Sequence, residues 1–243
     1  MKDFLLDIVE HTVPVGVFDQ IRVDGTATET KLSSTEKERR VVLRASMHGA
    51  VPEFVGTFGL PNLPLLSVLL KIPEYQEANA KLTVDRKVEN GIDQPRIIRF
   101  ENNASDFKND FRLMVASVIE SIEPVLKFNV TSWPLTFTPS VAAHQRLKYQ
   151  ISAIPDEKVV TFRIENGDVK AIFGDSTGHT GNFIFYSGVD PKAKETVVVP
   201  LDIVNSVLSL SGDKTIHMGG VGMMISIDSG IANYDYIIPM LTK

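Results

Sequence analysis

Two stretches of the chain resemble one another: Leu60–Lys71 reads LPNLPLLSVLLK, and Val199–Leu210 reads VPLDIVNSVLSL. When the two are aligned, the proline in second position and the letters SVL near the end coincide. The same offset carries a helical pattern at Asp3–His11 onto another near Ala142–Gln150. An internal repeat indicates a duplicated structural unit. We therefore expect each half of the chain to contain, in order, a helix, strands, a second helix and further strands.

The rest of the chain is mainly typical of strands, because apolar and polar residues alternate as they do in half-buried antiparallel strands. Asn166–Gly167 gives the strongest hairpin signal, since Asn-Gly favours the tight turn between two such strands. Leu113–Ile122 (LMVASVIESI) is also expected to be a strand. Four segments are expected to be short amphipathic helices, and these are Asp3–His11, Pro61–Ile72, Ser140–Ile154 and Pro200–Leu210.

The spacing of polar residues assigns a polar face to each expected helix. On the first helix this face holds Asp3, Asp7 and Glu10, and on the second it holds Ser67 and Lys71. The corresponding residues are Gln145, Arg146, Lys148, Tyr149 and Ser152 on the third helix, and Asp202, Asn205, Ser206 and Ser209 on the fourth.

The length of 243 residues suits two β-rich domains of about 120 residues each. The join is expected between Glu120 and Ser140, where three prolines favour extended backbone. We predict an N-terminal domain over residues 1–127, a C-terminal domain over 128–243, and a connector at about 120–138.

The composition restricts the class of protein. The net charge is −5, and a protein that wraps tightly on DNA is usually basic, so any contact with nucleic acid should be local and weak. The chain contains no cysteine, which excludes disulfides and thiolate metal sites. No apolar run is long enough to span a membrane, and the N-terminus lacks a signal-peptide pattern. We expect a cytoplasmic protein, in the host cytoplasm if it is viral.

The pentapeptide GDSTG at 174–178 matches the nucleophile elbow of serine hydrolases, with Ser176 as the nucleophile. That elbow needs a strand before the serine and a helix after it. Val169–Phe173 has the strand pattern, but Asn182–Val189 is also rich in β-forming residues, and glycines interrupt any helix between them. We therefore expect a hairpin loop and no enzyme, with no catalytic residue, metal or cofactor.

The order of elements resembles that of the DNA sliding clamps, the processivity factors of polymerases. The resemblance is best over Pro134–Lys243, where a helix (PSVAAHQRLKYQIS), paired strands (VVTFRIENGDVKAIFG), a second helix (VPLDIVNSVLSL) and final strands (MMISIDSGIANYDYIIPML) follow one another. It is closest to the trimeric clamps of T-even-type phages, with proliferating cell nuclear antigen as the cellular relative. In the first half, the loops at Thr30–Arg40, Glu74–Lys81 and Asn102–Phe111 have no counterpart that we can place.

The resemblance implies an α+β fold of two similar clamp domains, each with antiparallel sheets and two short helices. It further implies a homotrimer that closes into a pseudo-sixfold ring around double-stranded DNA, which it would hold without sequence preference. The helices would line the channel. The basic residues expected there are Lys71, Arg146 and Lys148, with Lys2 and Lys214 at the helix margins.

The resemblance also implies an apolar groove for peptides of the DNA polymerase and the clamp loader, between the connector and the C-terminal strand. The expected groove residues are Pro124, Val125, Leu126, Ile237, Ile238, Pro239 and Met240. The alternative is that the C-terminal residues complete the domain core. For the whole chain, the main alternative to a clamp is a β-rich phage structural or assembly protein with a duplicated domain and no role on DNA. A hydrolase that uses Ser176 is the other alternative.

Overall fold

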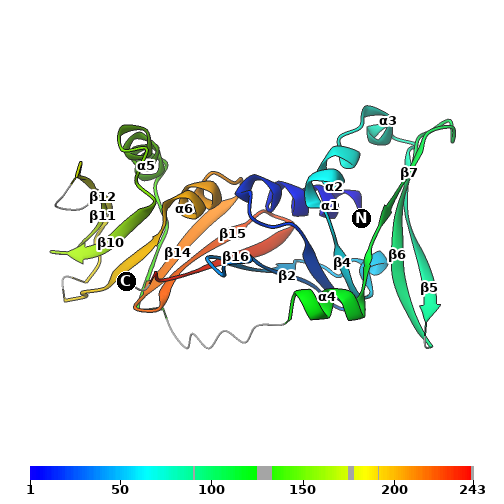
Figure 1. The fold of residues 1–243 in the computed structure, drawn as a ribbon, viewed down its shortest axis with the longest axis horizontal. Helices are drawn as coiled ribbons and strands as arrows, with labels where there is room; N and C mark the ends of the chain where they lie inside the picture. The colour runs from blue at the N-terminus through cyan, green and yellow to red at the C-terminus, as the bar shows by residue number, and fades with distance from the viewer. Residues whose placement is uncertain (90, 125–132, 175–177, 191, 242–243) are drawn as a thin grey trace. The chain divides into compact units, whose positions relative to one another are not determined.

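The computed structural model describes residues 1–89, 91–124, 133–174, 178–190 and 192–241 (Figure 1). The chain divides into two compact units. Unit 1 comprises Met1–Glu36, Leu43–Lys127 and Ser229–Tyr234, and unit 2 comprises Lys37–Val42, Phe128–Asp228 and Asp235–Lys243. The domain boundaries expected from the sequence stay a prediction. Among the described residues, no helix has the length and apolar character needed to cross a membrane.

Unit 1 contains four α-helices, two 3₁₀ turns and eight strands among its described residues. They are α1 (Lys2–Glu10), η1 (Val13–Val15), β1 (Ile21–Gly25), β2 (Thr30–Thr35), β3 (Val42–Met47), η2 (Pro52–Phe54), β4 (Gly56–Leu60), α2 (Leu63–Leu70), α3 (Pro73–Gln76), β5 (Lys81–Glu89), β6 (Ile92–Glu101), β7 (Lys108–Arg112), β8 (Met114–Val115) and α4 (Ala116–Ile122). The strands have the orders β8-β4-β1-β2-β3 and β5-β6-β7. β1 is antiparallel to β2 and β4, and β6 is antiparallel to β5 and β7.

The described residues of unit 2 form two helices and two groups of strands. Its elements are β9 (Leu135–Phe137), α5 (Val141–Ala153), β10 (Val159–Glu165), β11 (Asp168–Phe173), β12 (Gly181–Ser187), β13 (Thr196–Pro200), α6 (Leu201–Leu208), β14 (Asp213–Gly219), β15 (Gly222–Asp228) and β16 (Ala232–Pro239). The strand orders are β12-β11-β10-β13 and β9-β14-β15-β16. Figure 1 shows α5 and α6 beside one another in this unit.

The two units repeat one topology. In each unit a helix precedes four strands, and the first of these strands pairs with the second and the fourth. A second helix and three strands in sequential order then follow. The elements α1, β1 to β4, α2 and β5 to β7 therefore correspond to α5, β10 to β13, α6 and β14 to β16. The expected α+β fold of two similar domains is confirmed.

Local sequence signals explain where two of the helices, α2 and α5, begin. Asn62 Oδ1 accepts a hydrogen bond from the Leu65 amide at 3.2 Å, and Ser140 Oγ accepts one from the Ala143 amide at 3.0 Å. Such N-caps satisfy amide groups that the first turn leaves without partners. All four expected helices are present. The first has the expected length but begins one residue earlier, and the other three are two to four residues shorter than the sequence pattern suggested.

The hairpin expected at Asn166–Gly167 is confirmed. Both residues have positive φ, 54° and 85°, as a two-residue turn between right-twisted strands requires. The turn fixes the register of β10 against β11, in which Glu165 lies opposite Asp168. That register points Phe162 and Ile164 into the core of unit 2.

Each unit buries the apolar faces of its helices. In unit 1, Leu5 and Ile8 of α1 are buried with Leu63 and Leu66 of α2. In unit 2, Leu147 of α5 is buried, and Phe162 meets Phe185 edge to face with ring centroids 5.1 Å apart. Aromatic pairs prefer this geometry because the positive ring edge faces the negative ring face. The helices are therefore held by packing, and their outer faces are left for other contacts.

The strand expected over Leu113–Ile122 is wrong beyond its first residues. Met114 and Val115 pair with β4, but the chain then turns into helix α4. Ile119 is buried against Gly59, where an added Cβ would lie 2.8 Å from Ile119 Cδ1. Gly59 therefore makes room for the buried side chain of Ile119. Because a single helical residue is buried there, the strand-like periodicity of the sequence did not reveal the helix.

Two of the segments that looked like loops contain strands. Thr30–Thr35 forms β2, in which Thr30, Leu32 and Ser34 are buried in alternation. Lys108–Arg112 forms β7, where Phe111 is the buried residue. Both strands consist mostly of polar residues, and this composition concealed their period of two.

Candidate functional site

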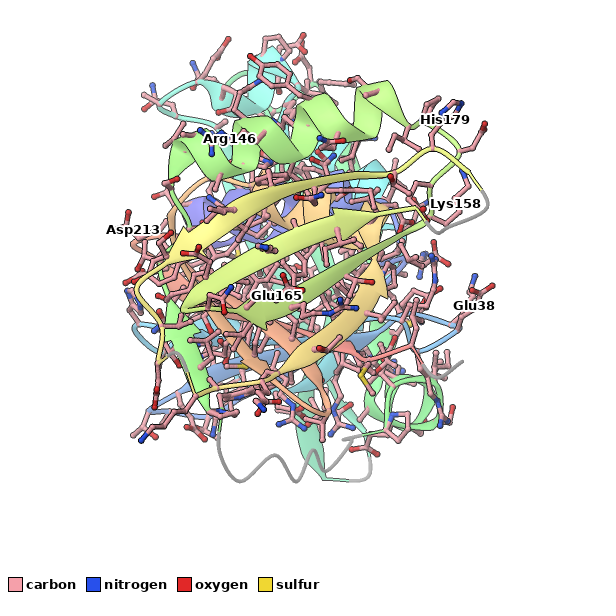
Figure 2. The ribbon with its side chains drawn as sticks, turned by 90° about the vertical axis from the view of Figure 1, so that its left-hand side faces the viewer. Glu38, Arg146, Lys158, Glu165, His179 and Asp213 are labelled. Atoms are coloured by element: carbon pink, nitrogen blue, oxygen red, sulfur yellow. The ribbon has the colours of Figure 1, made fainter. Side chains whose placement is uncertain are left out.

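Helix α5 presents an exposed basic face. Arg146 and Lys148 are exposed together with Tyr149, while Ala143 and Leu147 are buried beneath them. The helix contains no aspartate or glutamate. Figure 2 shows α5 crossing above the four-stranded sheet of unit 2, with Arg146 on the helix. The polar face expected for this helix is confirmed, and its only charges are positive.

The structure brings Lys148 and Lys214 close to a third basic group, His144. Burial lowers the pKa of His144, and the nearby charges of Lys148 and Lys214 lower it further. Burial also lowers the pKa of Lys214, whose ammonium group donates to the Gly212 carbonyl at 3.0 Å. His144 was not predicted as part of this cluster, because a single histidine four residues before a lysine has no distinctive spacing in the sequence.

The two other predicted basic residues, Lys2 and Lys71, lie in unit 1. They differ in the contacts of their ammonium groups. Lys2 Nζ donates to the carbonyl of Tyr75 at 2.8 Å, which ties α1 to α3. Lys71 is exposed at the C-cap of α2. Lys2 therefore already holds a structural contact, whereas Lys71 is open to solvent.

The polar face expected for α1 is wrong at Asp7. Asp3 and Glu10 are exposed, but Asp7 is only 6% exposed. Its carboxylate accepts hydrogen bonds from Tyr234 Oη at 2.7 Å and Ser229 Oγ at 3.0 Å. The buried carboxylate is satisfied by residues more than two hundred positions away in the sequence, a pairing that local spacing does not reveal.

The polar face expected for α2 is wrong at Ser67, which is only 7% exposed. Instead, Leu65 and Val68 are exposed by 46% and 62% beside the exposed Lys71. The short helix is apolar on nearly every side, so the position of Ser67 did not predict which side of the helix faces solvent. The outer face of α2 therefore offers apolar surface and one cation.

The predicted partner-binding residues fall into three groups. Pro124 is exposed, and Pro239 and Met240 are half-buried. Ile237 and Ile238 are buried within β16, at 5% and 0% exposure, so their side chains belong to the core of unit 2. Val125 and Leu126 lie outside the described residues.

Next to the C-terminal tail, unit 2 contains a cavity of about 580 Å³. It lies where α5 ends, β10 begins, and β13 leads into α6. Its apolar lining consists of Ile151, Pro155, Val159, Pro200, Leu201 and Leu241. Leu241 is held in place by its backbone, which donates to the Val198 carbonyl at 2.9 Å. The cavity was not predictable from the sequence, because its walls come from four separate parts of the chain.

Charged groups surround the cavity, and most of them already form ion pairs or hydrogen bonds within the chain. Arg40 pairs with Asp202 and with Glu38, each at 3.3 Å. The Glu157 carboxylate accepts from the amides of Lys158, Val159 and Gly174 at 2.7–3.1 Å. Lys158 is exposed and makes no ion pair with any residue that the structure describes (Figure 2).

The GDSTG segment connects two strands, as expected. β11 and β12 pair as an antiparallel hairpin on either side of it, so the strand that follows is not the helix that a nucleophile elbow requires. Ser176 itself lies outside the described residues. The geometry gives no support to a hydrolase.

Among the comparisons with known proteins, the one with solved structures bears on the fold. No family model matches the chain, and no curated protein matches it. Among solved structures, "C-terminal region of FEN-1 bound to A. fulgidus PCNA" matches with a TM-score of 0.66 at 12% identity, over 100% of this chain and 96% of the other. PCNA from Thermococcus kodakaraensis matches with a TM-score of 0.69 at 10% identity, over 99% of this chain and 97% of the other. The chain therefore has the fold of PCNA sliding clamps along its full length.

Proposed function

We propose that this protein is a non-enzymatic sliding clamp that encircles duplex DNA and tethers a DNA polymerase. The observation that carries the proposal is the duplicated topology, with α1 and α2 in unit 1 matched by α5 and α6 in unit 2. Its similarity to PCNA over the full chain supports the same role. We further propose that it works in the cytoplasm, as a clamp of the T-even phage type.

A homotrimer is the assembly that we propose. Strand β12 is at the edge of its sheet and exposes Ile184 by 44%, and β7 is at the edge of the three-stranded sheet. Exposed edge strands are prone to unwanted pairing unless another chain covers them. Closing a ring through such edges covers them, and a clamp loader would open the ring for DNA.

The DNA contacts that we propose come first from Arg146 and Lys148, then from Lys71 and Lys214. Few cations on a protein of net charge −5 give weak phosphate contacts, as sliding requires. Lys2 is the weakest candidate, because its ammonium group binds the Tyr75 carbonyl. Partner peptides of the polymerase and loader would bind near Pro124, Pro239 and Met240.

Light scattering over a concentration series tests the assembly. A native mass near three chains supports the ring, and processivity of a polymerase on primed DNA is then measured with the double variant Arg146→Ala, Lys148→Ala. We expect shorter products from this variant at an unchanged mass. A monomer at every concentration, with no effect on DNA synthesis, would favour a structural phage protein instead.

A further inference from the structure

The three-stranded sheet of unit 1 carries a second cavity, of about 420 Å³, where β5 and β6 meet the end of β7. This volume lies within the range of roughly 300–1,000 Å³ that is usual for ligand pockets. Four cations line the cavity, and these are Arg86, Lys87, Arg96 and Arg112. Asp85 is the one carboxylate in the described lining. Such a local excess of positive charge, on a protein of net charge −5, attracts anions.

An irregularity in the sheet shapes this cavity. The pairing of β5 with β6 changes register between Asp85 and Arg86, which leaves Arg96 as an extra residue of β6. The Leu113 amide donates to the Arg96 carbonyl at 2.9 Å and so holds the end of β7 beside the extra residue. Bulges of this kind re-aim side chains and are frequent next to functional sites.

The fold itself does not require these cations, because the corresponding strands of unit 2 lack them. β5, β6 and β7 contain four arginines and three lysines (Figure 1). Their counterparts β14, β15 and β16 contain one lysine and no arginine. The same arrangement of strands therefore forms without the positive charge, so the charge in unit 1 needs an explanation other than folding.

The carboxylates of this sheet are already paired. Asp85 and Asp110 both form ion pairs with Arg99, at 2.8 Å and 2.9 Å, and Arg99 does not line the cavity. Asp93 pairs with Arg86 at 2.7 Å. These three carboxylates are thus held by two arginines, and neither of the two is Arg112.

The lining cations differ in how firmly they are held. Arg86 is fixed in place, since its guanidinium also donates to the Val55 carbonyl at 2.7 Å. Lys87 and Arg96 have contacts of their own within the chain. Arg112 is exposed and makes no ion pair with any residue that the structure describes. An anion in the cavity would therefore pair most directly with Arg112.

We propose that this cavity binds a compact anion with two or three linked phosphates, such as inorganic tripolyphosphate or the triphosphate tail of a nucleotide. Guanidinium groups suit this class of ligand because their paired N–H groups match the oxygens of a phosphate. The apolar lining is limited to Ile97 and Leu113, and no aromatic side chain among the described residues lines the cavity. The phosphates, and not a base, would therefore be recognised. The inference goes beyond the proposed clamp function and does not rest on it.

The test uses the full chain in magnesium-free buffer at constant ionic strength. The ligands are tripolyphosphate, ATP and GTP, with sulfate as a control that carries no linked phosphates. Methyl and amide NMR shifts locate the site, and their titration gives the affinity. We expect shifts centred on Ile97 and Leu113, and tighter binding of tripolyphosphate than of sulfate. ATP and GTP should bind alike and about as tightly as tripolyphosphate.

Variants of Arg112 test the cation that pairs with the ligand. Arg112→Ala should weaken tripolyphosphate binding about two- to fivefold, the range that one exposed ion pair gives, and Arg112→Glu roughly four- to twenty-five-fold, because the charge changes by two. Lys108→Ala is the matched control: Lys108 lies on the same strand, pairs with Glu101 at 3.0 Å and does not line the cavity. It should leave the affinity unchanged.

Shifts centred on α5, equal affinities for sulfate and tripolyphosphate, or an undiminished affinity of Arg112→Glu overturn the inference. Nucleotide binding that depends on the base overturns recognition through phosphates alone. Duplex DNA that displaces tripolyphosphate overturns it in favour of a nucleic-acid contact. A native mass of Arg112→Glu below that of the unmodified protein overturns it in favour of a contact between subunits. A monomer without processivity that still binds tripolyphosphate would refute the clamp and leave this site in place.

Discussion

Replacing Asp7 with asparagine should destabilise the protein by about 2 kcal/mol. Asp7 Oδ2 accepts hydrogen bonds from both Tyr234 Oη and Ser229 Oγ. A hydrogen bond to a charged group contributes about 1.5–3 kcal/mol, against roughly 0.5–1.5 kcal/mol for a neutral pair. Asp7→Asn can keep both bonds through its amide oxygen but makes them neutral. The expected loss is therefore about 1 kcal/mol for each bond.

The loss should depend on pH in a defined direction. Burial raises the pKa of Asp7, but hydrogen bonds from His11 and Tyr234 and the charge of His11 together outweigh burial, so the net pKa is lowered. A carboxyl group with a lowered folded-state pKa stabilises the fold above its unfolded pKa, about 3.9. That stabilisation disappears as the pH falls through the folded value. The difference between the variant and the unmodified protein should therefore shrink below about pH 4.

Urea unfolding at pH 7 and pH 3 measures the free energies of unfolding. Asp3→Asn is the matched control, because Asp3 is exposed on the same helix and should change stability by less than about 0.5 kcal/mol. The reasoning is refuted if Asp7→Asn and Asp3→Asn unfold alike at pH 7, or if the loss at pH 3 is as large as at pH 7.

Three further predictions concern other parts of the chain. Gly59→Val should lower the free energy of unfolding by about 1–3 kcal/mol, because a Cβ at position 59 would lie 2.8 Å from Ile119 Cδ1. Thermal unfolding measures this loss, and an unchanged stability would contradict the packing of α4 against Gly59. Lys148→Ala should reduce the slope of log affinity for DNA against log salt by roughly 0.9 for each phosphate that the lysine no longer neutralises, with Lys194→Ala as an unchanged control. Burial raises the pKa of Glu123, so that side chain favours folding most at low pH and loses this contribution as pH rises through its folded pKa. Relative to the unmodified protein, Glu123→Gln should therefore gain stability in urea unfolding between about pH 4 and pH 7, and a constant difference would contradict this.

The sequence was sufficient for the repeated architecture because the repeat is encoded locally. In two of the helices, Leu63–Leu70 and Leu201–Leu208, the apolar residues that predict the helix lie within one or two consecutive turns. The Asn166–Gly167 turn is likewise determined by two residues. Signals of this range need no knowledge of distant packing, and all of them are confirmed by the structure.

Features that depend on distant contacts were not predictable in the same way. Asp7 looked like a surface residue because two of its partners, Ser229 and Tyr234, are at the far end of the chain. β2 and β7 are polar strands whose few buried residues become visible only when a neighbouring strand is known. The cavity of unit 2 has walls from four parts of the sequence, so no single stretch indicated it.

The residues that α1 and α5 expose in the structure also determine how the proposed ring would hold DNA. With Asp7 buried, α1 still exposes Asp3 and Glu10, while α5 exposes Arg146 and Lys148 with no carboxylate. The phosphates of an encircled duplex would therefore be attracted to α5 and repelled by α1. Duplex DNA inside a ring of three chains should therefore contact unit 2 of each chain in preference to unit 1. Contacts at three positions, each with few cations, hold the duplex loosely, so retention on DNA would come from closure of the ring rather than from affinity.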